Sequence, residues 1–307
     1  MISQLTSVAT LLVDITILLL KVIIGVFEAL YQTLVPVHEK SVANETVLIT
    51  GTGHGIGREL ALQFAQLGAK IVCVDINKEG NEETVKELKD RGFSKVHRFE
   101  CDVSDRDQVV QLAAKVQKEV GDVTYLVNNA GIMPCHPFSS SSADEIKKIF
   151  DINVFAHFWM LQMFLPSMVR NNHGHVVGIS SMAGVLGLNN LVPYCSSKFA
   201  VRGLMEALAE ELREDKRQLN NIKFTTIFPY IVNTGLCKKP RIRFPGLLGI
   251  VSPQDAAKHI IQAVRRDYRE ISIPSGLLAV NYILRMFPVK VTLMVKDFLD
   301  SGLESHD

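Results

Sequence analysis

The chain has 307 residues and a mass of 34.1 kDa, enough for one large domain or two small ones. Its 33 Lys and Arg nearly balance 32 Asp and Glu, and a formal charge of +1 excludes a globally basic surface, so no nucleic-acid partner is expected. With 47% apolar and 21% charged residues the chain is too apolar to be disordered, and its mean hydropathy of +0.18 is high for a soluble enzyme.

Residues 1–37 predict a hydrophobic helix that anchors the chain to a membrane or lipid droplet. The apolar run Leu5–Phe27 is long enough to cross a bilayer. Polar residues recur every seven positions in this run and directly after it, and they form one narrow stripe on a helix: Ser7, Asp14, Lys21 and Glu28. A helix that lies in the interface keeps such a stripe wet along its length, which favours that arrangement; a spanning helix stays the alternative. A secretory signal peptide would have basic residues before its apolar run, and none precedes this one.

From residue 38 to residue 275, short β-branched runs alternate with longer helical stretches. Seven runs are mostly continuous apolar segments, as expected for strands covered on both faces: Thr46–Thr50, Lys70–Asp75, Lys95–Glu100, Thr124–Asn128, His175–Ser180, Ile222–Phe228 and Glu270–Ile273. The helical stretches include Gly57–Leu67, Glu82–Lys89, Gln108–Val120, Ala143–Arg170 and Ser196–Leu212. This alternation predicts an α/β fold with a Rossmann-type, doubly wound parallel sheet of about seven strands in one domain.

The first strand runs into the glycine-rich segment Thr50–Arg58, where helical periodicity begins. Glycines at such a turn let the backbone bend sharply and let a pyrophosphate approach the N-terminus of a helix. Asp75 closes the second strand, where a carboxylate accepts hydrogen bonds from the adenosine ribose and repels a 2′-phosphate. Ile76 follows in place of an arginine. The pattern therefore predicts NAD rather than NADP as the cofactor.

Tyr194 and Lys198 are four residues apart near the start of a predicted helix and so share one face. An ammonium near a phenol favours the phenolate and lowers the phenol's pKa toward the range of a general base. Taken alone, the pair is also typical of an ordinary helix surface. Its position after the strand that ends at Ser180 and Ser181, on the carboxyl edge where such sheets bind ligands, favours catalysis.

These motifs resemble the short-chain dehydrogenase/reductase family from about Thr46 to Pro274. Ser181 precedes Tyr194 at the family's usual interval, and Asn153 falls in the long helix where the family keeps a catalytic asparagine. The other matching motifs are Gly51, Gly55 and Gly57 in the first turn and Asn128–Gly131 after the fourth strand.

The resemblance implies a role for each matching residue. Tyr194 would take a proton from a substrate hydroxyl, Ser181 would hold that oxygen, and Lys198 would bind the nicotinamide ribose, while Asn153 would hold a water in the proton relay. The residues implied in cofactor binding are Gly51, Gly55, Ile56, Gly57, Asp75, Asp102, Val103, Asn129, Ala130, Gly131, Tyr194, Lys198, Pro229, Val232 and Thr234. The family usually has glycine after Pro229, where this chain has Tyr230.

Asp75–Thr84, Gly121–Val123 and Tyr194–Phe199 most resemble a membrane-associated branch of that family, which includes retinol and 17-beta-hydroxysteroid dehydrogenases. The resemblance implies NAD-dependent oxidation of a lipophilic alcohol, on endoplasmic reticulum or lipid droplets, by a domain that faces the cytosol. A homodimer through Ala143–Arg170 and Ser196–Leu212 is also expected. The alternative function is a lipid-droplet scaffold with a largely structural NAD site.

Two further features bear on location and substrate. Leu236–Ile250, where the family places its substrate lid, mixes four cations with apolar residues that suit a phospholipid surface. The apolar C-terminal segment, residues 276–307, either packs on the domain or lies on the membrane. The five cysteines have no C-x-x-C pair, so reduced thiols and no metal site are expected: Cys73, Cys101, Cys135, Cys195 and Cys237.

Overall fold

The computed structural model describes residues 2–35, 37–246, 248–300 and 302–305. The chain divides into two compact units, Met1–Lys40 and Ser41–Asp307. Parts of three predicted segments lie outside the description. In the anchor these are residues 1 and 36 and the side chains of residues 2–9 and 32–34, which include Ser7 of the polar stripe. The others are Leu247 in the predicted lid and residues 301, 306 and 307 in the C-terminal segment.

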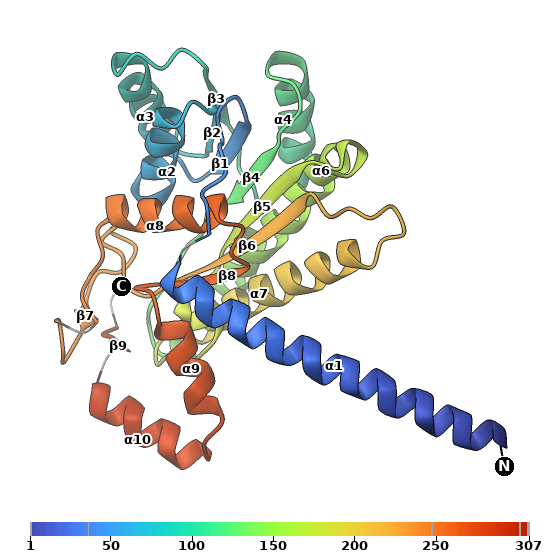
Figure 1. Cartoon of the computed structure of the whole chain (residues 1–307). Coiled ribbons are helices and arrows are strands. Elements are labelled where there is room, and N and C mark those ends of the chain that lie inside the picture. Colours follow the sequence, from blue (N-terminus) through green and yellow to red (C-terminus); the bar gives the residue numbers. More distant parts are fainter. Residues whose placement is uncertain (1, 36, 247, 301, 306–307) are drawn as a thin grey trace. The chain divides into compact units, whose positions relative to one another are not determined.

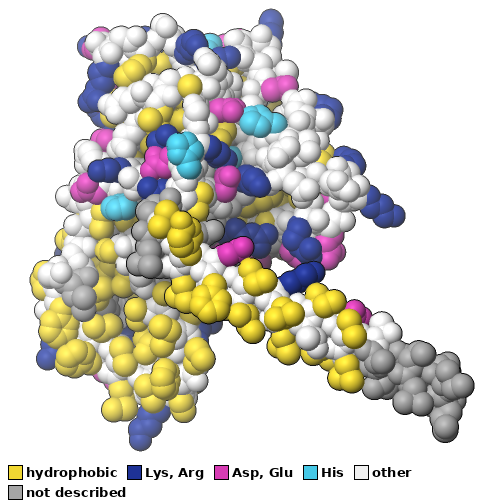
Figure 2. Space-filling model, in the orientation of Figure 1, with side chains coloured by type: hydrophobic (Ala, Val, Ile, Leu, Met, Phe, Trp, Pro, Cys, Tyr) yellow, Lys and Arg dark blue, Asp and Glu magenta, His cyan; other side chains and the backbone are white. Residues whose placement is uncertain are grey.

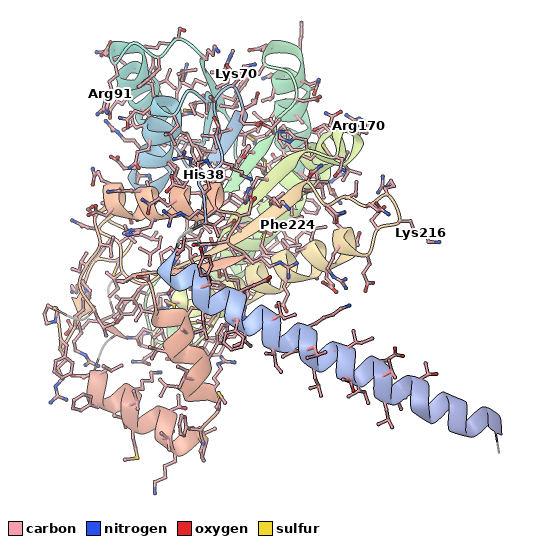
Figure 3. All side chains as sticks on the ribbon, viewed as in Figure 1. His38, Lys70, Arg91, Arg170, Lys216 and Phe224 are labelled. Atoms are coloured by element: carbon pink, nitrogen blue, oxygen red, sulfur yellow. The ribbon has the colours of Figure 1, made fainter. Side chains whose placement is uncertain are left out.

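The first unit is built on the helix α1 (Ile2–Leu34). Its segment Thr10–Tyr31 has a mean hydropathy of 2.4 and is long and apolar enough to cross a membrane. Within this unit the apolar side chains of that segment remain exposed around the helix (Figure 3). Because exposed leucine and isoleucine side chains on all sides are unfavourable in water, this helix favours a lipid environment.

The second unit contains a parallel sheet with the strand order β3-β2-β1-β4-β5-β6-β8, which confirms the predicted seven-stranded Rossmann-type fold (Figure 1). Its strands are β1 (Thr46–Thr50), β2 (Lys70–Asp75), β3 (Val96–Glu100), β4 (Tyr125–Asn128), β5 (Gly174–Ile179), β6 (Ile222–Pro229) and β8 (Glu270–Ile273). The order reverses between β1 and β4, where the crossovers leave toward opposite faces. A doubly wound sheet binds its ligands at this point, beyond the carboxyl ends of the strands.

Helices cover both faces of the sheet, and each face has its own apolar core. On one face lie α2 (Gly55–Gln66), α3 (Lys78–Asp90) and α8 (Pro253–Arg265). On the other lie α4 (Arg106–Glu119), α6 (Ala156–Asn171) and α7 (Val192–Arg213), and Phe224 of β6 packs among their side chains (Figure 3). The continuous apolar character of the strands follows from this burial on both faces.

The predicted helix Ala143–Arg170 is not a single α-helix. It is divided into α5 (Ala143–Phe150), a π-helical turn η2 (Asp151–Phe155) and α6. A π turn inserts an extra residue into the helical ladder, which apolar periodicity does not reveal, and such turns are frequent at functional sites. The helix α8 was not among the stretches singled out from the sequence.

The C-terminal segment contains two further helices, α9 (Leu277–Arg285) and α10 (Val289–Leu299). Leu278 and Asn281 of α9 are buried, whereas no residue of α10 is. Figure 2 shows apolar side chains gathered over these two helices. Beyond them, β9 (Gly302–Leu303) pairs antiparallel with β7 (Pro240–Arg241). Two short 3₁₀ turns, η1 (Phe138–Ser140) and η3 (Met182–Gly184), complete the described elements.

Candidate active site

A pocket opens at the carboxyl edge of the sheet, beyond the ends of β1, β4, β5 and β6. It contains most of the predicted site residues: Gly51, Gly55, Ile56, Asn129, Ala130, Gly131, Ser181, Tyr194, Lys198, Pro229, Val232 and Thr234. Five others do not line it directly: Gly57, Asp75, Asp102, Val103 and Asn153. The fold thus brings together residues that are far apart in the chain, from Gly51 to Thr234.

The glycine-rich turn needs glycine for steric reasons. Gly51 has a φ of +77°, a conformation that other residues rarely adopt. A Cβ at Gly57 would lie 2.0 Å from the carbonyl oxygen of Gly51, and a Cβ at Gly55 would lie 3.0 Å from the side chain of Thr234. The turn therefore folds tightly on itself, and the loop after β6 approaches it closely.

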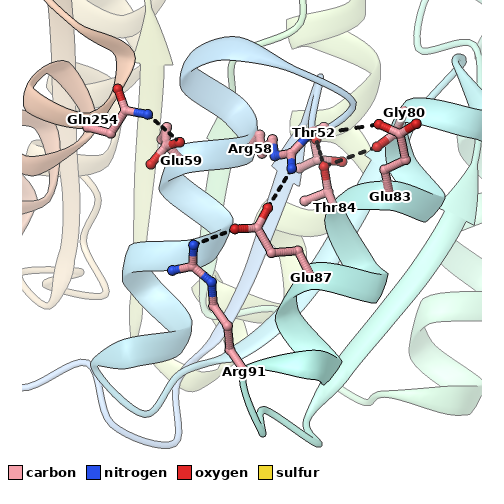
Figure 4. Close-up of polar contacts among 9 residues, drawn as sticks. All are labelled: Thr52, Arg58, Glu59, Gly80, Glu83, Thr84, Glu87, Arg91 and Gln254. Atoms are coloured by element: carbon pink, nitrogen blue, oxygen red, sulfur yellow. Dashed lines mark hydrogen bonds and ion pairs between the residues drawn. The ribbon is translucent and has the colours of Figure 1, made fainter.

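Polar contacts fasten this turn to α3. The Thr84 hydroxyl donates to Thr52 O at 2.8 Å, and the Thr52 hydroxyl donates to Asn81 Oδ1 at 2.8 Å. One turn into α2, Arg58 forms an ion pair of 2.5 Å with Glu87 of α3 (Figure 4). These contacts hold the N-terminus of α2 in place, with its backbone N–H groups at the carboxyl edge of the sheet.

Asp75 ends β2 next to the turn and is buried. Its Oδ2 accepts from Gly53 N at 2.7 Å and its Oδ1 accepts from Asn77 N at 2.8 Å. Asp102 and Val103 follow β3, the strand beside β2, so they lie at the same edge of the sheet as Asp75. The Asp102 Oδ1 atom accepts from the backbone and hydroxyl of Ser104.

The segment after β4 packs against the turn through Thr50. Its hydroxyl accepts hydrogen bonds from the backbone N–H groups of Asn129, at 3.0 Å, and Ala130, at 3.1 Å. The Asn129 amide donates to Thr50 O at 2.8 Å. Both sides of the cofactor crevice are therefore joined by short polar contacts.

Asn153 is fully buried in the π turn, below the pocket. Its Nδ2 donates to Ile132 O at 2.9 Å and to the Ser197 hydroxyl at 3.1 Å, and its Oδ1 accepts from Ile132 N at 2.9 Å. The side chain thereby ties the loop after β4 to α7, immediately before Lys198. The contact is close, since a Cβ on Gly131 would lie 3.1 Å from Asn153 Oδ1 and 3.6 Å from Lys198 Nζ.

Tyr194, Lys198 and Ser181 meet in the pocket. Tyr194 and Lys198 lie in the first two turns of α7, and Ser181 comes directly after β5. Lys198 Nζ donates to Ile179 O at 2.9 Å and lies 5.7 Å from the centre of the Tyr194 ring. The Ser181 hydroxyl donates to Pro229 O at 3.3 Å and accepts from Ala183 N at 3.1 Å.

Burial controls the ionisation of this group. It raises the pKa of Tyr194 to about 12, although a hydrogen bond with Ser181 acts in the opposite direction. Burial also lowers the pKa of Lys198 to about 8. The prediction that the ammonium brings the phenol's pKa below its ordinary value is therefore wrong for this structure, because desolvation of the buried phenol outweighs its hydrogen bond with Ser181.

A buried histidine lies behind Lys198. Both ring nitrogens of His157, on α6, lack a hydrogen-bond partner among the described residues. Burial first, and the charge of Lys198 second, lower the pKa of His157 to about 3. This imidazole is therefore neutral at neutral pH.

Apart from the predicted site residues, the wall of the pocket is largely apolar. Its residues come from the segments after β4, β5 and β6, from the predicted lid and from the C-terminal segment: Met133, Met182, Leu188, Leu191, Tyr230, Leu236, Cys237, Gly302 and Leu303. The contributions of Gly302 and Leu303 were missed because no periodicity places the last residues of a chain next to its middle. The pocket also includes His54, which the sequence had shown only as part of the turn.

Two of the four cations in the predicted lid, Leu236–Ile250, contact other residues of the chain. Arg241 forms an ion pair of 2.9 Å with Asp300, and Arg243 donates to Phe298 O at 3.0 Å. These cations join the lid to the end of α10 and are not simply aligned along one exposed side.

Comparison with known proteins agrees with this fold. The family model described as short chain dehydrogenase matches residues 45–242, and the chain belongs to this family. It is an oxidoreductase of the dehydrogenase type, as the sequence predicts.

Two curated relatives cover almost the whole chain. The chain is 42% identical to epidermal retinol dehydrogenase 2 of Mus musculus over 279 residues, which cover 91% of this chain and 90% of that protein. It is 39% identical to estradiol 17-beta-dehydrogenase 11 of Homo sapiens over 285 residues, 93% of each protein. Both matches extend well beyond the family motifs.

A solved short chain dehydrogenase/reductase from Burkholderia phymatum, in complex with NAD, superposes with a TM-score of 0.71. It is 27% identical, and the match covers 80% of this chain and 94% of that one.

Proposed function

We propose that this protein is an NAD-dependent dehydrogenase that oxidises a lipophilic alcohol, either retinol or a 17-beta-hydroxysteroid, at a membrane surface. One observation carries the proposal: Tyr194, Ser181 and Lys198 share a pocket with a glycine-rich turn, and the rest of the pocket wall is largely apolar. An apolar wall with a few convergent polar groups suits a hydrophobic alcohol better than a sugar. The names of the two curated relatives support this substrate class.

The turn fits a dinucleotide. The absence of side chains at Gly51, Gly55 and Gly57 lets the turn fold tightly at the N-terminus of α2, and the backbone N–H groups of a helix N-terminus favour a pyrophosphate. Asp75 would accept hydrogen bonds from the ribose hydroxyls and repel a 2′-phosphate, which favours NAD. The remaining cofactor contacts proposed are Asp102 and Val103 beside the adenine, Ile56, Asn129, Ala130 and Gly131 along the crevice, and Pro229, Val232 and Thr234 at the carboxamide.

When bound, NAD supplies the hydride acceptor. In its phenolate form, Tyr194 would take the proton from the substrate hydroxyl and become the neutral phenol, while the Ser181 hydroxyl would hold the same substrate oxygen. Lys198 binds the nicotinamide ribose. The Nδ2 atom of Asn153 already donates to Ile132 O and to the Ser197 hydroxyl. The relay water would therefore donate a hydrogen bond to an oxygen of Asn153, either Oδ1 or the backbone carbonyl oxygen.

The experiment is an assay of NADH formation with retinol and with estradiol in detergent, using the full chain. Turnover of at least one alcohol, lost in Tyr194→Phe, is expected. Binding of NAD without turnover of any lipophilic alcohol would contradict the proposal and favour the scaffold alternative.

The proposed location is the endoplasmic reticulum membrane or a lipid droplet, with the second unit in the cytosol. The support is the apolar helix α1. Full-length protein should float with phosphatidylcholine vesicles in a density gradient. Replacing Leu19 and Ile23, both more than half exposed, by Asp should leave it at the bottom. Flotation of that variant with the vesicles would show that α1 is not the anchor.

A further inference from the structure

We propose that the C-terminal tail, residues Gly302–Glu304, brings Gly302 and Leu303 into the wall of the substrate pocket and that Leu303 limits the size of the alcohol accepted. The inference rests on the proposed function, because it concerns the substrate side of the same pocket. Both Gly302 and Leu303 line that pocket, although they lie far beyond Ile242, the last residue that the family model covers. This wall therefore lies outside the part of the chain that carries the family motifs.

The side chain of Leu303 packs against the apolar cluster that includes Tyr194. This cluster consists of Cys135, Ala183, Leu191, Tyr194 and Cys195, with Met133, Leu188 and Leu303 packed against it. Leu303 is the member that comes from the end of the chain. It therefore stands on the side of the pocket where the carbon skeleton of an alcohol held by Tyr194 would extend.

The backbone of the tail is held by three separate loops. The Asn190 amide, in the loop before α7, donates to Leu303 O at 3.2 Å. The backbone N–H of Glu304 donates to Lys239 O of the lid at 3.1 Å, and the Cys135 thiol, in the loop after β4, donates to Glu304 O at 3.5 Å. The pairing of β9 with β7 adds to these contacts. A segment bonded on three sides is a fixed wall, unlike a loose terminus.

The residues just before the tail reinforce it. Lys296 Nζ donates to Gly187 O at 2.8 Å, and the rings of Phe244 and Phe298 lie 5.3 Å apart, centre to centre. The guanidinium of Arg243 lies over both rings, at 5.3 and 5.2 Å. The end of α10 and the lid thus bring Leu303 to the pocket together.

If Leu303 lines the wall, changing its side chain should change the size of the alcohol that the pocket accepts. Adding or removing a few methylene groups in an apolar pocket changes discrimination by about 10- to 200-fold. Leu303→Ala should open the pocket and Leu303→Trp should narrow it. Neither change reaches the glycine-rich turn or Asp75, so the affinity for NAD should stay the same.

The first experiment measures kcat/KM for a bulky and a small lipophilic secondary alcohol with purified full-length protein in detergent. The ratio of bulky to small should fall by about tenfold or more in Leu303→Trp and rise in Leu303→Ala. The matched control is Leu293→Ala, which removes the same atoms from an exposed position of α10, and its ratio should equal that of the unaltered protein. If the unaltered protein is active and the bulky-to-small ratio of kcat/KM is the same in both Leu303 variants, the inference is overturned while the proposed function stands.

A second experiment needs no activity. Cys135 is buried beneath the tail, and a buried thiol reacts slowly with maleimide. Ending the chain after residue 301 should speed modification of Cys135 by at least about tenfold, as measured by peptide mass spectrometry. Cys73, fully buried in β2, should not change and reports that the domain stays folded. If Cys135 in the shortened chain reacts no faster than in the full chain, the inference is overturned. If Cys135 reacts faster in the shortened chain but the full chain turns over no alcohol, the tail position is upheld and the proposed function is contradicted.

Discussion

Lys198 Nζ lies 5.7 Å from the centre of the Tyr194 ring, while its hydrogen bond goes to the carbonyl oxygen of Ile179 at 2.9 Å. Burial shifts both groups toward their neutral forms, with the lysine pKa at about 8 and the tyrosine pKa at about 12. The protein thus holds an ammonium and a phenol in a desolvated pocket, where any added charge or hydrogen bond has a large effect on their ionisation.

Removing the phenol oxygen should remove catalysis and leave binding intact. Tyr194→Phe is expected to lower kcat by about 10²- to 10⁴-fold, the usual contribution of a general acid or base. The NAD dissociation constant, measured by fluorescence titration, should not change. Tyr282→Phe is the control, because that hydroxyl bonds to Glu270 on the surface. Normal turnover by Tyr194→Phe would refute the proposed role.

Burial of Lys198 should lower the free energy of unfolding at neutral pH. Its folded pKa of about 8 lies below its ordinary value of 10.5, so the unfolded chain binds the proton more tightly. The destabilisation is complete below pH 8 and disappears as the pH rises from 8 to 10.5. After allowance for the lost bond to Ile179, Lys198→Met should raise the free energy of unfolding by about 1–2 kcal/mol at pH 7. Urea unfolding at pH 7 and pH 10 tests this, and a gain that persists at pH 10 would contradict it.

His157 should weaken the protein in acid. Its folded pKa of about 3 lies below the ordinary 6.5, so the unfolded state takes up more protons between these values. Stability is complete above pH 6.5 and falls as the pH drops from 6.5 toward 3. His157→Leu removes two unpaired ring nitrogens and should flatten this acid limb. At pH 7 the variant should be about 1–2 kcal/mol more stable. Parallel pH–stability curves for the two proteins would be inconsistent with this explanation.

Asp75 should set both cofactor choice and the shape of the turn. Asp75→Ala removes the acceptor of Gly53 N and Asn77 N, and should lower the free energy of unfolding by about 1–3 kcal/mol. The KM for NAD should rise by about tenfold or more, with a smaller change for NADP. Asp107→Ala, on the exposed first turn of α4, is the matched control. An equal change for both cofactors would speak against a role in choosing between them.

A homodimer is expected through α6 and α7. Phe158 of α6 and Phe199 of α7 are 39% and 40% exposed, which is unusual for phenylalanine on a soluble surface. In detergent, light scattering should give the mass of two chains, and Phe158→Asp with Phe199→Asp should give that of one. Phe138→Asp, at another exposed phenylalanine, should leave the dimer intact. Unaltered protein that runs as one chain would rule this partner out.

Much of the site could be predicted because it depends on local sequence. Gly57 has no room for a Cβ. Tyr194 and Lys198 share one face whenever their segment is helical. Asp75 ends a strand that its apolar run predicts. Each of these constraints acts over a few residues. The seven strands were likewise predicted to within one residue at every end, because burial on both faces leaves a continuous apolar run.

Other features depend on contacts between distant parts of the chain. The π turn at Asn153 accompanies bonds to Ile132 and Ser197, and the pKa values of Tyr194 and Lys198 depend on how deeply the finished fold buries them. The place of Leu303 in the pocket wall is set by β7 and by Asn190.

The sequence by itself therefore determined the sheet, the cofactor turn and the tyrosine–lysine pair, because periodicity, steric room and residue spacing are properties of neighbouring residues. Only the tertiary structure decided the ionisation of that pair and the wall that faces it. Desolvation and long-range packing arise when segments far apart in the chain meet, and no short stretch of sequence carries that information.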